Sequence, residues 1–263
     1  MDLVIGNSQL SKYFPDNYIK ISSRNIDFDF LKDNVWNAVY ITFAEQRIYE
    51  KNIDYITPNY LYTLKIIESL LKNSNKIVCY TSCELWGESS GHISLTTKPN
   101  FNTNNEYAIS KLLLLNKIKE RRLIDDMYNK VVLIHPFYFN SVYRNEYFLF
   151  GKIFDSIINH KRINVGNLNF YRDMVHTSFL VKKSIEQNND CVIGAGKLFH
   201  VRDFIKDLYK LNELDFDYFV TEETNMPNKQ KLIMADVEWE YSYDNLLSDT
   251  IRDIKENGDI WKQ

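Results

Sequence analysis

The chain has 263 residues, of which 44% are hydrophobic, and a formal net charge of −3. This length and composition suit one large α/β domain with a small appended lobe, and the near-neutral charge argues against a nucleic-acid-binding surface. The three cysteines lack metal-ligand spacing, and the sequence shows neither a signal-peptide pattern nor the roughly 18-residue apolar run of a membrane span. We therefore expect a cytoplasmic protein without a bound metal, a nucleic-acid partner or a membrane association.

Short apolar runs alternate with helical patterns through the first half of the chain. Strands are expected at residues 3–5, 18–21, 37–42, 77–80 and 130–134, and helices at residues 6–14, 60–71 and 106–121. This alternation predicts parallel βαβ units in a doubly wound, Rossmann-like α/β sheet. Ligands of such sheets bind at the carboxyl ends of the strands, where Gly6, Thr42 and Ser82 should lie.

The alternation fades after Pro136. Residues 137–164 are rich in aromatic side chains, with a helix expected at residues 151–159. We expect residues 1–136 to form a dinucleotide-binding domain, to which residues 163–180 and 190–196 return. The remainder of residues 137–263 should form a smaller C-terminal lobe that binds the substrate.

A tyrosine and a lysine share one face of the helix expected at residues 106–121. Tyr107 and Lys111 lie four residues apart, which places them on the same side of a helix. A lysine ammonium beside a phenol favours the phenolate and lowers the tyrosine pKa, so Tyr107 should exchange protons near neutral pH. Ser82, at a strand end, is placed to hold a substrate oxygen. Together these residues predict a site that oxidises an alcohol or reduces a carbonyl.

Four stretches resemble motifs of one enzyme family. Thr81-Ser82-Cys83-Glu84-Leu85-Trp86-Gly87 resembles the strand-end S-S-x-x-V-Y-G motif of the extended short-chain dehydrogenase/reductases, with Trp86 where tyrosine is usual, and residues 107–111 resemble the Y-x-x-x-K motif. Residues 167–176 and 190–204 resemble two further stretches, in the family's order. The chain is identified as a member of this family of sugar-nucleotide epimerases, dehydratases and reductases. The resemblance implies a nicotinamide cofactor, a nucleotide-sugar substrate and a homodimer formed through the helices at residues 60–71 and 106–121.

The cofactor end departs from the family pattern. Of the glycines expected after the first strand only Gly6 is present, in Gly6-x-Ser8-x-x-Ser11. Serine can donate to a phosphate, so binding remains the favoured interpretation; a turn that has lost its nucleotide is the alternative. After the second strand, Ser22-Ser23-Arg24 replaces the acidic residue that would hold the ribose, and a cation with hydroxyls suits a 2′-phosphate. NADP is therefore favoured over NAD.

Further cofactor contacts are implied by the resemblance, including Asp27 at the adenine and Asn59 beneath the loop that covers the cofactor. Phe43 in that loop has core packing as its alternative. The cofactor-binding residues expected in this way are Gly6, Ser8, Gln9, Leu10, Ser22, Arg24, Asp27, Phe43, Ala44, Arg47, Asn59, Tyr107, Lys111 and Pro136.

The substrate side is also assigned by resemblance. Arg172 matches the arginine that grips the nucleotide diphosphate, because its planar fork binds phosphate bidentately; a surface ion pair with Asp173 is the alternative. His176 either reaches the pocket or packs internally. The substrate-binding residues expected are Ser82, Cys83, Glu84, Asn140, Arg172 and His176.

The favoured function is reduction of a nucleotide-linked keto-sugar, a deoxysugar or heptose for surface polysaccharide, with NADP as the cofactor. Hydride passes to the sugar carbonyl, and Tyr107, aided by Ser82 and Lys111, protonates the oxygen. The first alternative is an NAD-dependent C4 epimerase or 4,6-dehydratase in which Glu84 acts as the base. A non-catalytic, nucleotide-binding member of the fold is the second.

Overall fold

The computed structural model describes residues 1–47, 52–87, 89–223, 225 and 231–262, which divide into two compact units. Unit 1 comprises Met1–Gly87, Leu95–Pro136 and Val181–Ile193, and unit 2 comprises Glu88–Ser94, Phe137–Leu180 and Gly194–Gln263. The expected boundary at Pro136 coincides with a change of unit. Residues 163–180, expected to return to the first domain, instead belong to unit 2. The returning segment is Val181–Ile193, so of the expected return at residues 190–196 only residues 190–193 lie in unit 1.

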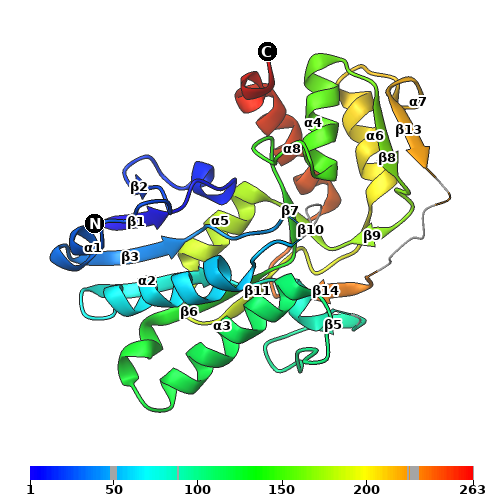
Figure 1. The fold of residues 1–263 in the computed structure, drawn as a ribbon. Helices are drawn as coiled ribbons and strands as arrows, with labels where there is room; N and C mark the ends of the chain where they lie inside the picture. The colour runs from blue at the N-terminus through cyan, green and yellow to red at the C-terminus, as the bar shows by residue number, and fades with distance from the viewer. Residues whose placement is uncertain (48–51, 88, 224, 226–230, 263) are drawn as a thin grey trace. The chain divides into compact units, whose positions relative to one another are not determined.

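A six-stranded parallel sheet forms the centre of unit 1, which confirms the predicted doubly wound α/β fold (Figure 1). Its order is β11-β6-β4-β3-β1-β2, and every neighbouring pair is parallel. Buried apolar residues dominate the central strands because helices cover both faces of such a sheet. The strands are β1 (Asp2–Ile5), β2 (Ile19–Ile21), β3 (Trp36–Ile41), β4 (Ser74–Tyr80), β6 (Val131–Pro136) and β11 (Cys191–Ile193).

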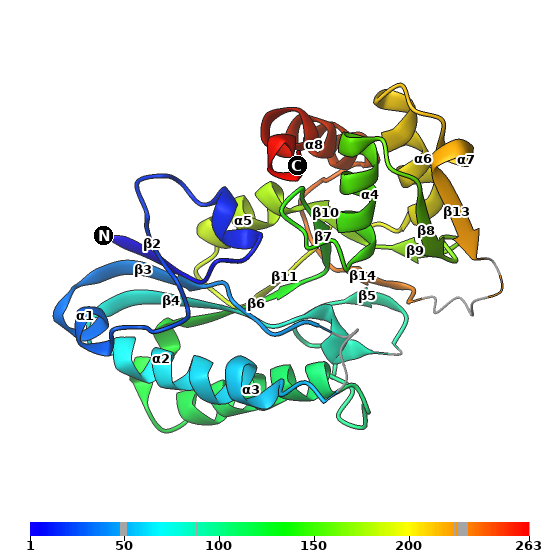
Figure 2. The same ribbon diagram turned by 45° about the horizontal axis from the view of Figure 1, so that its top comes forward.

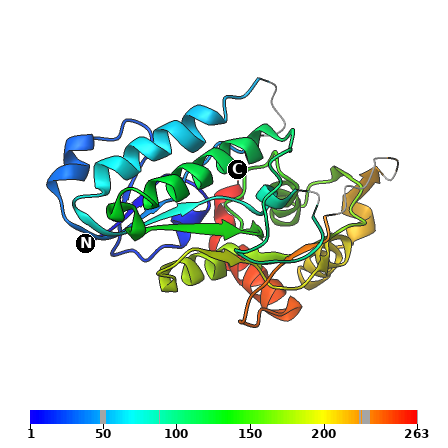
Figure 3. The ribbon, with the colours of Figure 1, turned by 90° about the horizontal axis from the view of Figure 1, so that it is seen from below.

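Helices lie on both faces of this sheet. Helices α2 and α3 run side by side over one face, and the part of α5 from Val181 onward lies over the other (Figures 2 and 3). The predicted helix at residues 60–71 begins earlier, with a π-helical turn that leads into α2. The helical segments of unit 1 are η1 (Leu10–Tyr13), α1 (Phe28–Asp33), η2 (Thr57–Tyr62), α2 (Thr63–Leu70), η3 (Cys83–Trp86), α3 (Glu106–Arg122), η4 (Asp126–Lys130) and the end of α5 (Thr177–Glu186).

The strand order places a switch point between β1 and β3, because the chain crosses from β1 to the edge strand β2 and back to β3. Gly6 directly follows β1, and its N–H donates to Ile21 O at 2.9 Å. Thr42 directly follows β3, and its N–H donates to Ile5 O at 2.9 Å. The carboxyl ends of β1 and β3 therefore meet where ligands of open α/β sheets bind.

In its described residues, unit 2 contains short two-stranded ladders and three longer helices. The pairs are β7 with β10, β8 with β13, β9 with β12, and β5 with β14. None of the helices within the described ranges is long and apolar enough to cross a membrane. The elements are β5 (Gly91–Ile93), β7 (Tyr138–Asn140), α4 (Leu149–Asn159), β8 (Ile163–Gly166), β9 (Tyr171–Arg172), β10 (Met174–His176), β12 (Phe199–His200), α6 (Val201–Leu211), α7 (Phe216–Phe219), β13 (Val220–Glu223), β14 (Ile233–Ala235), α8 (Tyr243–Asn257) and η5 (Gly258–Trp261).

Candidate active site

The end of β4 fixes the position of Ser82. Its backbone is extended, and its Oγ accepts a hydrogen bond from Glu84 N at 3.2 Å, so that Ser82 caps the turn η3. The side chain is almost completely buried. A serine that caps a turn in this way has its hydroxyl oxygen fixed by the backbone and its proton still available for donation.

Tyr107 and Lys111 occupy the first turns of α3, which Asn105 caps through a bond from Ala108 N to its side chain at 3.3 Å. Both side chains are buried, with 8% and 2% of their surface exposed. Lys111 Nζ donates to Tyr80 O at 3.0 Å and lies 5.9 Å from the centre of the Tyr107 ring. Since a hydrogen bond also joins the side chains of Tyr107 and Ser82, the three predicted catalytic residues lie together.

The pKa of Tyr107 differs from the sequence-based expectation. Burial raises the pKa of Tyr107 to about 12, although hydrogen bonds from Ser82 and Gln46 act in the opposite direction. Burial also lowers the pKa of Lys111 from 10.5 to about 8. The expectation that Lys111 lowers the pKa of Tyr107 is therefore wrong for this structure, because desolvation of the phenol dominates and the ammonium is bonded to a backbone carbonyl. Tyr107 is a neutral phenol at neutral pH.

Glu84 lies close enough to Tyr107 for its charge to contribute to raising the pKa of the phenol. Its Oε2 accepts a hydrogen bond from Asn105 Nδ2 at 3.3 Å, so the residue that caps α3 also holds this carboxylate. Cys83 beside it is buried, as a small apolar side chain would be. Among the described residues, no three His, Cys, Asp or Glu side chains are grouped closely enough to hold a metal ion.

In the turn after β1, position 6 has no room for a residue larger than glycine. Gly6 has φ of +127°, and a Cβ there would lie 2.8 Å from both Phe43 N and Thr42 Oγ1. Two residues on, Ser8 Oγ is buried and has no hydrogen-bond partner among the described residues. Buried hydroxyls are normally bonded, so this atom is suited to a polar ligand group such as a phosphate. Gln9 and Leu10 complete the turn and are also buried.

The residues after β2 present a cation and a hydroxyl to solvent. Ser22 and Arg24 are exposed, and Arg24 N donates to Ser22 Oγ at 3.1 Å. Asp27, expected at the adenine, caps α1: its Oδ1 accepts from Asp29 N at 3.0 Å and from Phe30 N at 3.1 Å. This capping role gives a structural reason for Asp27, and its contact with adenine stays a prediction.

Asn59 ties the loop after β3 to the helix that carries Tyr107. It is fully buried, and its side chain accepts from Glu45 N at 2.7 Å and donates to Glu45 O at 3.0 Å. Its Nδ2 also donates to Ser110 Oγ at 3.1 Å, and Ser110 Oγ donates to Tyr107 O at 2.7 Å. A single amide therefore joins the loop expected to cover the cofactor to the turn of α3 that carries Tyr107.

The remaining cofactor residues expected in unit 1 lie at strand ends or in the same loop. Phe43 and Ala44 are half-buried, whereas Arg47 is exposed and pairs with Glu45 at 2.8 Å. Pro136 is buried at the end of β6. These positions are compatible with a ligand at the carboxyl edge of the sheet.

His135 is a buried group beside this site to which the sequence assigned no role. Its Nδ1 is hydrogen-bonded to Thr81 Oγ1, and its ring meets the Trp86 ring edge to face, with centroids 5.4 Å apart. Burial lowers the pKa of His135 to about 4, so the imidazole is neutral at neutral pH. His135 stands where the family's strand end commonly has arginine, and Trp86 where it has tyrosine, but neither departure revealed that the two rings pack together.

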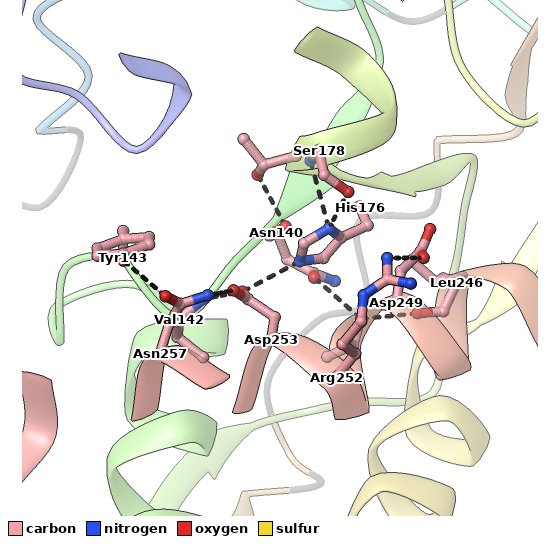
Figure 4. Close-up of polar contacts among 12 residues, drawn as sticks. Asn140, Val142, Tyr143, His176, Ser178, Leu246, Asp249, Arg252, Asp253 and Asn257 are labelled. Atoms are coloured by element: carbon pink, nitrogen blue, oxygen red, sulfur yellow. Dashed lines mark hydrogen bonds and ion pairs between the residues drawn. The ribbon is translucent and has the colours of Figure 1, made fainter. Parts of the chain in front are cut away.

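Two of the expected substrate residues belong to a buried hydrogen-bond network within unit 2 (Figure 4). His176 Nε2 lies 3.1 Å from Asp253 Oδ2, which also accepts from Val142 N at 2.8 Å. Asn140 O accepts from Thr177 Oγ1 at 2.8 Å. His176 is 1% exposed, so within this unit it has the packing role that was its alternative. Asp253 was missed because nothing in the sequence links α8 to a histidine 77 positions away.

Arg172 is held by aromatic rings. Its guanidinium lies 4.5 Å from the centre of the Phe170 ring and 5.0 Å from that of Tyr138, and its Nη1 donates to Tyr171 O at 2.7 Å. The alternative, a surface ion pair with Asp173, is wrong because Asp173 is fully buried. The Asp173 carboxylate accepts hydrogen bonds from three backbone N–H groups, those of Ala195, Gly196 and Ala235.

Comparison with known protein families gives one match that covers most of the chain. A model of the NAD dependent epimerase/dehydratase family matches residues 16–182, which include the Ser82, Tyr107 and Lys111 positions. The turn at Gly6 precedes the matched part. No curated protein sequence matches the chain.

Several solved structures share the fold along nearly the whole chain. RMD from Pseudomonas aeruginosa, complexed with NADPH, is 14% identical, with a TM-score of 0.76 and coverage of 96% of this chain and 98% of that chain. A dTDP-glucose 4,6-dehydratase from Bacillus anthracis, in complex with NAD, is 15% identical, with a TM-score of 0.77 and coverage of 100% and 99%. A UDP-N-acetylglucosamine 4-epimerase from Methanobrevibacter ruminantium, in complex with UDP-N-acetylmuramic acid, is 16% identical, with a TM-score of 0.76 and coverage of 97% and 96%. At these identities the similarity concerns the fold.

Proposed function

Because the chain belongs to the NAD dependent epimerase/dehydratase family, we propose that it is an NADP-dependent reductase of a nucleotide-linked keto-sugar. The substrate would be a deoxysugar or heptose intermediate of surface polysaccharide biosynthesis, which takes place in the cytoplasm. The observation that carries the proposal is the buried set of Ser82, Tyr107 and Lys111 within unit 1. Such a set has the groups needed to hold a carbonyl oxygen and to protonate it.

The residues at the carboxyl edge of the sheet fit a dinucleotide. Gly6 lets the turn after β1 pack closely against Thr42 and Phe43, and the buried Ser8 hydroxyl would offer a pyrophosphate a hydrogen bond. Ser22 and Arg24 would hold a 2′-phosphate, and Lys111 the nicotinamide ribose. The nicotinamide, when bound, supplies the hydride. The solved complex of RMD with NADPH supports a phosphorylated dinucleotide, whereas the dehydratase complex with NAD supports the alternative.

Tyr107 carries the proton that the reductive direction requires. Reduction of a carbonyl requires a proton for the substrate oxygen, and a phenol with a pKa of about 12 carries that proton at neutral pH. The Ser82 hydroxyl would hold the same oxygen, since it is bonded to Tyr107 already. Oxidation of an alcohol would instead require the phenolate at the start.

Substrate binding by unit 2 forms a separate part of the proposal. Arg172 would grip the nucleotide diphosphate, and the rings of Phe170 and Tyr138 beside its guanidinium would keep the planar fork oriented. Asn140 and His176 retain their expected role at the sugar only if the buried network around them opens toward the ligand. Cys83 and Glu84, which follow Ser82 in unit 1, are also proposed to contact the substrate.

Glu84 supports the first alternative, an NAD-dependent C4 epimerase or 4,6-dehydratase. Its carboxylate lies near enough to Tyr107 to affect the pKa of the phenol, and Asn105 holds it in place. An epimerase or dehydratase that retains NAD would use a base at this position. A reductase does not need a base at this position, so replacement of Glu84 distinguishes the two functions.

We also propose that the chain forms a homodimer through η2, α2 and α3. Leu61 and Leu113 on these segments have 51% and 37% of their surface exposed, although leucine is normally buried. Sedimentation analysis of the wild type and of Leu113→Glu tests this: a dimer that dissociates in the variant is expected, and a monomeric wild type contradicts it.

The reductase is tested by the loss of NADPH absorbance with a panel of nucleotide-linked keto-sugars. We expect consumption of NADPH in proportion to the keto-sugar, a decrease in turnover of about 100-fold or more in Tyr107→Phe, and little change in Glu84→Gln. Tyr128→Phe is the matched control, because it removes a phenol that is bonded to Glu68 elsewhere in unit 1. Interconversion of nucleotide sugars without net NADPH consumption, abolished in Glu84→Gln, would establish the alternative.

A further inference from the structure

Tyr62 lies at the end of the π-helical turn η2, and its hydroxyl reaches the segment that follows β2. It donates a hydrogen bond to Ser23 O at 3.1 Å, a contact between residues 39 positions apart. We infer that Tyr62 is a positioning residue that sets the preference of this chain for a 2′-phosphorylated dinucleotide. The inference rests on the proposed function, since it concerns the cofactor-binding turn assigned there.

The turn that Tyr62 contacts is short and strongly bent. β2 ends at Ile21, Asn25 has φ of +60°, and Asp27 already caps α1. Within the turn, Arg24 N donates to Ser22 Oγ, which is a local bond between neighbouring residues. The bond to Ser23 O therefore connects the middle of an exposed turn to a helix. Removing it would leave the directions of the Ser22 and Arg24 side chains less fixed.

The ring of Tyr62 is itself held on two sides. Its centroid lies 5.9 Å from that of Phe43, in the loop expected to cover the cofactor, and 6.3 Å from that of Phe28, at the start of α1. Asn59, three residues earlier in the same turn η2, anchors that loop through Glu45. One helical turn thus fixes both segments that would flank the adenosine half of a dinucleotide. Irregular turns of this kind recur at functional sites.

The charges near the turn favour an anion. Arg24 is exposed and makes no ion pair with any residue that the structure describes. Lys65 Nζ lies 4.4 Å from the centre of the Phe28 ring, which adds a second cation at the start of α1. Asp27, the acidic residue closest to Arg24 in the sequence, has an oxygen committed to two backbone N–H groups. An Arg fork that is held in one direction binds phosphate better than one that is free to rotate.

Tyr62 should therefore affect the selectivity for NADPH over NADH and not the affinity for both dinucleotides. NADPH and NADH differ at the 2′ position, so a residue that only orients the 2′-phosphate ligands should alter NADPH binding and leave NADH binding unchanged. One hydrogen bond contributes about 1 kcal/mol net, which corresponds to about fivefold in affinity. A residue with a merely structural role would weaken the binding of both dinucleotides together.

The experiment is calorimetric titration of the wild type and of Tyr62→Phe with NADPH and with NADH. The variant keeps the ring and its contacts with Phe28 and Phe43 and loses only the hydroxyl. We expect the NADPH Kd to rise about fivefold and the NADH Kd to stay within about twofold of the wild-type value. Tyr128→Phe, which loses a phenolic hydrogen bond to Glu68 elsewhere in unit 1, should change neither.

A double-mutant cycle with Arg24→Gln tests whether Tyr62 acts through Arg24. When Arg24 is already replaced by Gln, Tyr62→Phe should not change the ratio of the NADPH Kd to the NADH Kd any further, because the cation that Tyr62 orients is absent. Equal weakening of NADPH and NADH binding in Tyr62→Phe, or no change in either, would overturn the inference while leaving the proposed function intact. A wild-type protein that binds neither dinucleotide, or prefers NADH, would overturn the NADP proposal and the inference with it.

Discussion

Replacement of Lys111 by methionine should stabilise the protein while it destroys catalysis. The buried ammonium has its pKa lowered from 10.5 to about 8, so the folded state holds this proton less tightly than the unfolded state does. Below about pH 8 the charged lysine therefore destabilises the fold by about 3 kcal/mol, and this cost fades as the pH rises toward the unfolded pKa. Methionine removes the cost but also removes the bond to Tyr80 O, worth about 1 kcal/mol.

We therefore expect Lys111→Met to be about 2 kcal/mol more stable than the wild type at pH 7. By about pH 10 the folded lysine is neutral, and the advantage should disappear. Urea unfolding, followed by the fluorescence of the four tryptophans, measures the difference at both pH values. Lys119→Met is the control, because Lys119 is exposed on the same helix and its loss should have little effect at either pH. A variant that is less stable at pH 7, or a difference that does not change with pH, would refute the reasoning.

Three further predictions concern single side chains. Tyr107→Phe should keep NADPH binding within about twofold and lose at least about 100-fold in turnover, measured by calorimetry and steady-state kinetics, since the proton donor alone is removed. Gly6→Ala should lose dinucleotide binding and about 1–3 kcal/mol of stability, because its Cβ would lie 2.8 Å from Phe43 N; an unchanged melting temperature would contradict this. Asp173→Asn should lower the free energy of unfolding in urea by about 2 kcal/mol. The carboxylate accepts from three backbone N–H groups, and in asparagine an NH₂ group would replace one of its oxygens and face one of these donors. An unchanged free energy of unfolding would show that the carboxylate is not required.

The central sheet and the positions of Ser82, Tyr107 and Lys111 could be predicted from the sequence because their signals are local. Strands β3, β4 and β6 are apolar runs that are buried on both faces, and such runs are recognisable without knowledge of the fold. The placement of Ser82 directly after a strand followed from the same pattern. Helix α3 begins at Glu106 as expected, since Asn105 is a suitable cap for its first turn.

Features that depend on tertiary packing could not be predicted. The pKa of Tyr107 was predicted in the wrong direction, because the degree of burial outweighs the nearby lysine and is not encoded in residue spacing. Strands β9 and β12 have two residues each, which is too short for any alternation to be visible. The π-helical turn that orients Tyr62 was expected to be an ordinary helix that began at residue 60.

The measurement that tests the central claim most directly is calorimetric titration of the purified protein with NADPH, NADH and their oxidised forms. The account predicts exchangeable binding that is tighter for NADPH than for NADH, since Arg24 stands where an acidic residue would select NAD. Purified protein that retains NAD tightly would contradict the reductase and favour an epimerase or dehydratase with Glu84 as the base. Absence of binding by all four would contradict both enzyme functions.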